Sequence, residues 1–274
     1  VYEVPWTNIY HETKVTRKPV LSRLVESLSL PLFWGRALFG LKKRKRMVSG
    51  LIMGSVGMLI WWVSTLTLAV VSLDAVVSPD RFDFSELQWP HGVALAAFAV
   101  STWLKRDLEF VVDVGAFARN YLRSRRFRMS TLQHVIQAWQ DIRAAHPGAR
   151  FAVVSHSWGT ILHLDSMPIL RSGETQPAVA HVTLGSPAAV LTARQPSLAQ
   201  TWRDNTRGLG RNWVDFHSRY DWLCGPITFG EPSPDSRDLD LSHDFSSRIN
   251  RNHDSYYGRH EVISYLSEWT EDRK

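Results

Sequence analysis

This 274-residue chain contains a serine that could attack a carbonyl carbon with the help of a histidine and an aspartate. The three residues stand far apart in the sequence. Ser157 lies in S-H-S-W-G, which is one residue different from G-x-S-x-G, a pattern that places a serine on a sharp strand-to-helix turn. Ser155 replaces the first glycine, and Gly159 keeps the second. Small residues suit both positions because the serine backbone is strained and the helix crosses close to the strand. His156, beside the serine, is expected to pack or to line a pocket.

Such a turn offers an exposed hydroxyl, a helix amino-terminus and a backbone N–H. The N–H of Trp158 can donate to an oxyanion, and the helix amino-terminus favours developing negative charge. The alternative is that Ser157 only caps a helix that follows a buried strand. The pattern therefore marks Ser157 as a candidate nucleophile.

A serine of this kind needs an acid and then a histidine later in the chain, on loops after later strands. Asp221 follows a strand-like run, whereas Asp215 lies inside it, so we favour Asp221 and keep Asp215 as the alternative acid. His253 precedes the last predicted helix, whereas His260 falls within it, so we favour His253. In this scheme His253 takes the proton of Ser157, and Asp221 fixes the tautomer of His253 and stabilises the imidazolium. The other histidines considered are interpreted as structural or surface residues: His11, His134, His146 and His181.

The elements that must position these residues follow Lys105. Helical patterns alternate there with short apolar runs, which is typical of an α/β sheet with parallel strands. We predict helices over 107–126, 129–148, 157–170 and 255–271, and strands over 149–155, 178–187 and 211–218.

The first half contains two uncharged segments, 47–73 and 87–104. A helix of about 20 apolar residues can cross a bilayer, and basic residues precede the first segment and follow the second. The pattern predicts a transmembrane helical hairpin over 47–104 with cytoplasmic outer ends and anionic lipids at the basic flanks; a buried soluble hairpin is the alternative. Residues 18–46 are predicted as an amphipathic basic juxtamembrane helix that lies on the membrane or packs on the second half.

Composition narrows the function classes. Cys224 is the single cysteine, which excludes an internal disulfide and favours a reducing compartment. The formal net charge is +6, but the basic runs border apolar spans and no nucleic-acid motif accompanies them, so we expect no nucleic-acid partner. The sequence contains no dinucleotide-binding, phosphate-loop or metal-ligand motif, and we expect no cofactor and no metal. The first residue is Val1, and we expect the natural chain to begin earlier.

Four motifs carry a resemblance to a known family: "VVSHSWGT", "HVTLGSPA", "YDWLCGP" and "NHDSYYGRHEVISYL". With them, residues 107–269 resemble the α/β-hydrolase superfamily, close to bacterial lipase-like and esterase-like serine hydrolases. The resemblance implies a mostly parallel sheet with flanking helices and ester cleavage through a serine acyl-enzyme without a cofactor. Residues 1–17 resemble an early strand segment of such a domain. The hairpin would then be an insertion before a catalytic region at 105–274, and some amino-terminal strands would be missing.

One departure from the family concerns the second oxyanion donor, which comes from a loop after an early strand. No such loop stands in a suitable place, since "PHGV" at 90–93 lies in the second uncharged segment. Our leading expectation is a hydrolase anchored in the inner membrane that cleaves lipid-like acyl esters on the cytoplasmic side. The alternative is a membrane-attached scaffold or sensor with a degenerate hydrolase fold, and the oligomeric state stays open.

Overall fold

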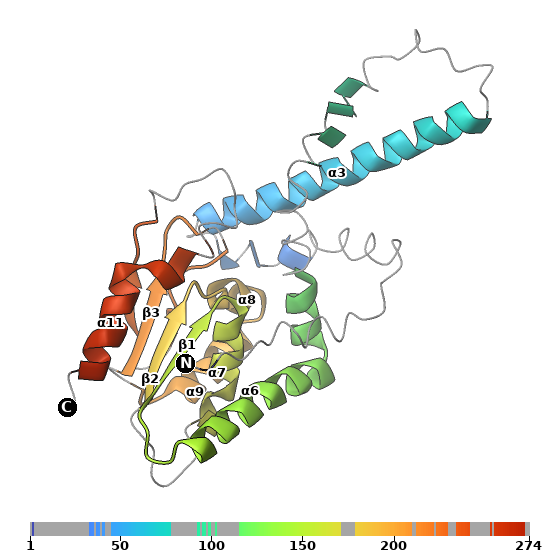
Figure 1. Cartoon of the computed structure of the whole chain (residues 1–274). Coiled ribbons are helices and arrows are strands. Elements are labelled where there is room, and N and C mark those ends of the chain that lie inside the picture. The colour runs from blue at the N-terminus through green and yellow to red at the C-terminus, as the bar shows by residue number, and fades with distance from the viewer. Residues whose placement is uncertain are drawn as a thin grey trace.

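The apolar runs of the second half form a parallel β-sheet in the computed structural model (Figure 1). The strand order is β1-β2-β3-β4, with β1 at Phe151–His156, β2 at Val179–Leu184, β3 at Trp213–His217 and β4 at Asp235–Asp238. The pairing brings Ser155 opposite Thr183, and Thr183 opposite Asp215. Because all strands run in one direction, their carboxyl ends lie at the same end of the sheet. The candidate site lies at this end.

The structure describes Tyr2 and residues 33–35, 37–38, 40–41, 45–77, 92–93, 95–96, 98–99, 102, 115–170, 179–209, 212–221, 223–229, 234–241, 253 and 255–271. The strand expected within 1–17 lies outside these residues, apart from Tyr2.

Helices cover both faces of the sheet (Figure 1). One face packs against a core that includes Leu132 of α6 (Arg125–Ala145), Ile161 of α7 (Trp158–Leu170), Leu191 of α8 (Ala188–Arg194) and Trp202 of α9 (Ser197–Thr206). The other face forms a second cluster in which Val182 and Phe216 pack with Val262 of α11 (His260–Glu271) and with the 3-10 helix η5 (Ser255–Gly258). The sheet is therefore the middle layer of an α/β arrangement.

A buried carboxylate joins the helices of the first face. The Asp165 side chain on α7 is only 1% exposed, and it accepts hydrogen bonds from Tyr121, Arg128 of α6 and Trp202 of α9. The Arg128–Asp165 distance is 2.7 Å, and the Trp202–Asp165 distance is also 2.7 Å. Because every donor comes from a different segment, these bonds fix the helix that follows Ser157 relative to its neighbours.

The structure confirms the α/β class and the parallel sheet that the sequence predicts. Strands β1, β2 and β3 and helices α6, α7 and α11 lie within the predicted ranges or within four residues of them. The sequence did not predict α8, α9 or β4. The residues of β4, Asp235–Asp238, are polar and exposed at the sheet edge, so they lack the apolar alternation by which a strand is recognised.

In the described part of 47–104, the structure does not show the predicted transmembrane hairpin. The first uncharged segment does form a helix, α3 (Lys45–Val77), which extends away from the sheet (Figure 1). Among the residues that the structure describes, however, no helix combines the length and the apolar character that crossing a membrane requires. Residues 78–91, which would connect the two arms, lie outside the described residues.

The described part of the segment 18–46 packs on the second half of the chain. Phe33, Trp34, Ala37 and Leu41 are buried in the same core as α7 and α8. The backbone oxygen of Phe33 accepts a hydrogen bond from the guanidinium of Arg194 at 3.1 Å. Of the two interpretations offered for this segment, packing on the second half therefore describes these residues.

We expect a methyl group at Gly40 to disturb this contact. An added Cβ would lie 2.7 Å from Cβ of Ala193 and 2.9 Å from its backbone Cα, so α8 would have to shift. Gly40→Ala should lower the free energy of unfolding by about 1–3 kcal/mol, measured by urea denaturation. Gly35→Ala is the matched control, because nothing lies within 4 Å of its new Cβ. The control should be neutral or slightly stabilising, and equal losses in both variants would contradict the close packing.

Candidate active site

Ser157 occupies a strained turn between β1 and α7. Its φ is 55°, and among the described residues it is the non-glycine residue with positive φ. Such a conformation persists only where its surroundings hold it. The Ser157 N–H donates to the Leu184 oxygen at 3.0 Å, and the Ser157 oxygen accepts from the Thr160 backbone and hydroxyl at 3.0 and 2.7 Å. The turn therefore has the strained geometry that the sequence pattern predicts.

A buried chain of hydrogen bonds supports the turn from below. The Ser155 hydroxyl donates to the Val182 oxygen at 3.2 Å and, in turn, accepts from Nδ1 of His163 at 2.8 Å. Nε2 of His163 then accepts from Nδ1 of His181 at 2.9 Å. Burial, and then the nearby His181, lower the pKa of His163 well below its ordinary value, so the His163 ring stays neutral. These hydrogen bonds therefore join β1, α7 and β2, the elements next to Ser157.

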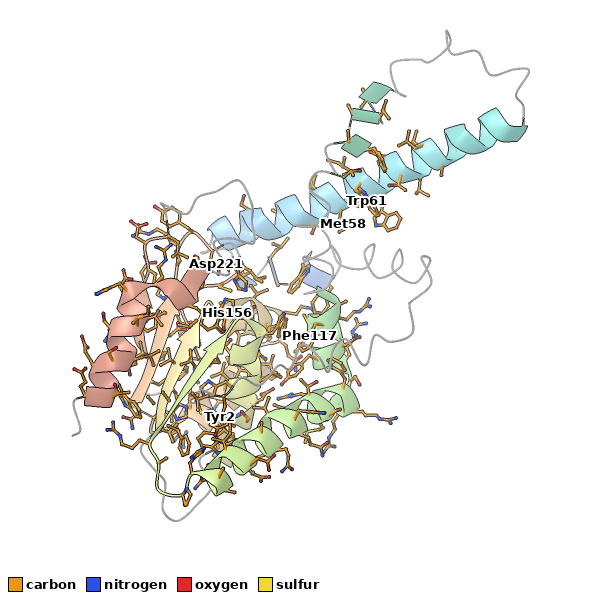
Figure 2. The ribbon with its side chains drawn as sticks, viewed as in Figure 1. Tyr2, Met58, Trp61, Phe117, His156 and Asp221 are labelled. Carbon is orange, nitrogen blue, oxygen red and sulfur yellow. The ribbon has the colours of Figure 1, made fainter. Side chains whose placement is uncertain are left out.

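The structure brings Ser157, His253 and Asp221 into one line of hydrogen bonds. Nε2 of His253 lies 2.7 Å from Oγ of Ser157, and Nδ1 of His253 lies 2.8 Å from Oδ2 of Asp221. His253 is 2% exposed, and so is Asp221. The ring can thus accept the serine proton at one nitrogen while it donates to the carboxylate at the other. Figure 2 shows Asp221 near His156 at the end of the sheet where β1 terminates.

The two candidate acids occupy different environments. Asp215 lies on β3, and its carboxylate accepts from Thr183 at 2.8 Å and from the Ile227 N–H at 2.9 Å. Burial alone would raise the pKa of Asp221, but the adjacent His253 and the hydrogen bonds from His253 and Leu223 hold it below its ordinary value. Asp221 therefore remains a carboxylate beside the histidine, and Asp215 acts as a structural acceptor in the sheet.

His156 connects the serine turn to the segment that carries the histidine. Its Nε2 donates to the backbone oxygen of His253 at 2.6 Å, and the two rings lie 4.8 Å apart. Burial and then the nearby His253 lower the pKa of His156 to about 4. His156 is therefore neutral at pH 7 and packs in the site, as the sequence suggested.

The oxyanion side of the site is described in part. Trp158 and Gly159 lie in the first turn of α7, whose amides have no intrahelical acceptor and face developing negative charge favourably. The indole of Trp158 is buried and packs against Phe117, with 4.9 Å between ring centroids. Residues 1–17, which the sequence predicts as an early strand segment, lie outside the described residues apart from Tyr2.

Asp221, Cys224 and His253 have potential metal-ligand atoms within 4.8 Å of one another. Each of these atoms already has a hydrogen-bond partner within the group or nearby, and the Cys224 thiol donates to the Gly185 oxygen at 2.7 Å. Burial and then the charge of Asp221 raise the pKa of Cys224 well above its ordinary value, which disfavours the thiolate that a metal needs. We therefore assign no metal to this group.

Sequence reasoning missed two residues of the site. The Cys224 sulfur lies 3.5 Å from Nδ1 of His253, and the Tyr256 hydroxyl donates to Oδ2 of Asp221 at 3.1 Å. Cys224 lies in "YDWLCGP" and Tyr256 in "HDSYYG", so both stand within three residues of a predicted site residue. That proximity in sequence is the signal that could have marked them.

Comparisons with protein families, with curated proteins and with solved structures find no match to this chain. The functional argument therefore rests on the residues and geometry of the site.

The low pKa of His156 predicts that the protein loses stability as the pH falls from about 6.5 to about 4. In this window the unfolded state binds a proton that folded His156 does not, and below pH 4 both states bind it. The loss from this group should approach about 3 kcal/mol, measured by urea denaturation at several pH values. His156→Phe should lose less stability across the same window; an equal loss would show that other groups cause it.

Proposed function

We propose that this chain is a serine hydrolase that cleaves carboxylic esters through an acyl-enzyme on Ser157. The observation that carries the proposal is the line from Oγ of Ser157 to His253 and Asp221, at 2.7 and 2.8 Å, with the serine on a backbone turn of positive φ. This combination is the arrangement that activates a serine hydroxyl.

The proposed reaction has two halves. His253 takes the proton of Ser157 as the hydroxyl attacks the ester carbon, and the Trp158 N–H donates to the oxyanion. His253 then gives this proton to the leaving alcohol, which departs with the electrons of the cleaved C–O bond. In the second half a water molecule attacks the acyl carbon, His253 takes its proton, and Ser157 leaves with a proton returned by His253. Asp221 stabilises the imidazolium in each half.

We propose the α/β-hydrolase superfamily as the family of this chain. The proposal is based on the motifs around Ser157, Asp221 and His253 and on the parallel sheet. The same three residues could open a thioester or an amide, so the reaction type is better supported than the substrate. The second candidate is a scaffold or sensor with a degenerate hydrolase site. The geometry of the three side chains favours the enzyme, because His253 is placed to take the proton of Ser157 while Asp221 holds the ring.

We propose further that the chain acts at a lipid surface, which suggests lipid-like acyl esters as substrates. Apolar side chains on one stripe of α3 are between 43% and 66% exposed, at spacings of three and four residues: Ile52, Val56, Leu59, Val63, Leu66 and Val70. A second helix could also cover such a stripe, but helix pairs in water usually carry charged flanks. Residues 47–73 have no charged residue, and five basic residues precede them at 42–46, which favours a bilayer with anionic lipids.

The proposed activity is tested by labelling with a fluorophosphonate probe, which reacts with an activated serine. The wild-type protein should be labelled, and Ser157→Ala and His253→Ala should not be. Asp221→Asn should slow labelling by roughly 10³–10⁴-fold, because the histidine loses its orienting carboxylate. Asp215→Asn is the matched control, with rates compared per folded molecule, and it should label at close to the wild-type rate.

One result would contradict the proposal, and another would change the residue that serves as the acid. A folded wild-type protein that resists the probe would favour the scaffold. A steep loss in Asp215→Asn without one in Asp221→Asn would transfer the acid role to Asp215.

The proposed lipid contact is tested by sedimentation with vesicles of phosphatidylcholine alone or with added phosphatidylglycerol. The wild-type protein should bind both and prefer the anionic vesicles, and Val63→Asp should weaken binding because it puts a charge in the apolar stripe. Ile263→Asp is the control, since Ile263 is exposed on α11. Light scattering tests whether a second copy of the chain covers the stripe instead. A wild-type protein that forms a dimer and does not bind vesicles, and whose dimer Val63→Asp dissociates, would assign the stripe to a second copy of the chain.

A further inference from the structure

Asp221 has a second side-chain donor besides the histidine. Oδ1 accepts from the Leu223 N–H at 3.0 Å, whereas Oδ2 accepts from His253 at 2.8 Å and from the hydroxyl of Tyr256 at 3.1 Å. Tyr256 is fully buried. We propose that Tyr256 is a positioning residue of the reaction, which fixes Oδ2 of Asp221 and sets how strongly this oxygen attracts the proton of His253. The inference rests on the proposed hydrolase function.

The fold leaves room for the tyrosine ring at one particular residue. Gly185 follows β2, and a Cβ there would lie 2.7 Å from Cε2 of Tyr256. Gly185 has a φ of 53°, its N–H donates to the Phe216 oxygen at 2.9 Å, and its oxygen accepts from the Cys224 thiol. The glycine therefore admits the ring and also ties down the loop that carries Asp221.

Packing holds the ring independently of its hydroxyl. Tyr256 belongs to the apolar cluster on the α11 face of the sheet, with Val182, Leu184, Phe216 and Val262 among its members. Since a phenylalanine would fill the same space, the hydroxyl is the one group of Tyr256 that packing does not require. Its hydrogen bond to Asp221 is then a separate contribution that a single-atom change can test.

Tyr256 can only donate to Asp221. Burial and then the charges of Asp221 and Cys224 raise the pKa of the Tyr256 hydroxyl well above its ordinary range, so the hydroxyl keeps its proton. A donor on Oδ2 withdraws negative charge from the oxygen that faces His253 and limits the directions in which the carboxylate can turn. Without this donor, the carboxylate should hold an imidazolium more strongly and orient the ring less well.

Tyr256→Phe tests the inference. We expect kcat/KM for a p-nitrophenyl ester to fall about tenfold at pH 7, the scale of one lost hydrogen bond to a charged group. The acid limb of the kcat/KM profile should move to higher pH by about half a unit or more, because the imidazolium persists longer. Tyr265→Phe is the matched control: Tyr265 packs on the same cluster, contacts the Phe216 ring and should change neither quantity.

A readout besides activity separates the failure of this inference from that of the proposed function. Nuclear magnetic resonance of ¹⁵N-histidine-labelled protein follows the titration midpoint of the His253 ring, which should rise in Tyr256→Phe whether or not an ester is cleaved. An inactive wild-type protein would end the proposed function, and the midpoints would still decide the role of Tyr256. An unchanged midpoint in Tyr256→Phe, even with reduced stability, would overturn the inference.

Gly185→Ala provides a second variant, which retains the Tyr256 hydroxyl but changes its position. The new methyl group should displace the Tyr256 ring, and the His253 midpoint should then move in the same direction as in Tyr256→Phe. A folded Gly185→Ala protein in which the midpoint falls or stays constant would also overturn the inference.

Discussion

The strained backbone at Ser157 is the constraint on which the rest of the site depends. A non-glycine residue at a φ of 55° costs of order 1–3 kcal/mol, so neighbouring bonds must fix it. The Ser157 N–H and oxygen are both bonded, to Leu184 and to Thr160, and the Thr160 hydroxyl also lies 2.7 Å from that of Ser186. These contacts tie the turn to the carboxyl end of β2. The serine hydroxyl consequently projects from a rigid edge toward His253.

Polar groups inside the sheet layer serve this rigidity because each has a partner. The chain from Ser155 through His163 to His181 and the pair of Thr183 with Asp215 lie in or beside adjacent strands. Asp165 gathers three donors on the helical face. Buried groups of this kind are costly when unpaired, and when paired they favour one arrangement of the elements over others. The α/β core is therefore specified by hydrogen bonds as well as by apolar packing. Both hold β1 and β3 in register with β2, which lies between them.

The sequence predicted the parts of this structure that follow from local patterns. Apolar runs of strand length gave β1, β2 and β3, and a near match to a turn pattern marked Ser157. The exposed polar strand β4 carries no such pattern. The role of Tyr256 depends on a contact across 35 residues and on the absence of a side chain at Gly185, which no local periodicity can reveal. Long uncharged segments predicted membrane crossing, but composition alone does not fix how a helix is placed; α3 buries Met58 and Trp62 while it exposes its apolar stripe.

The serine and the histidine are coupled by backbone as well as by side chain, and this determines how the site tolerates change. His156, next to Ser157, bonds the backbone oxygen of His253, while Nε2 of His253 meets the serine hydroxyl. A displacement of the segment that carries His253 would therefore pull on the strained turn, and relaxation of the turn would move the histidine. Asp221 contacts the other nitrogen of the His253 ring, and Leu223 and Tyr256 also fix it. Substitutions around Asp221 should therefore report on the proton affinity of His253, whereas those around Ser157 should report on the turn itself.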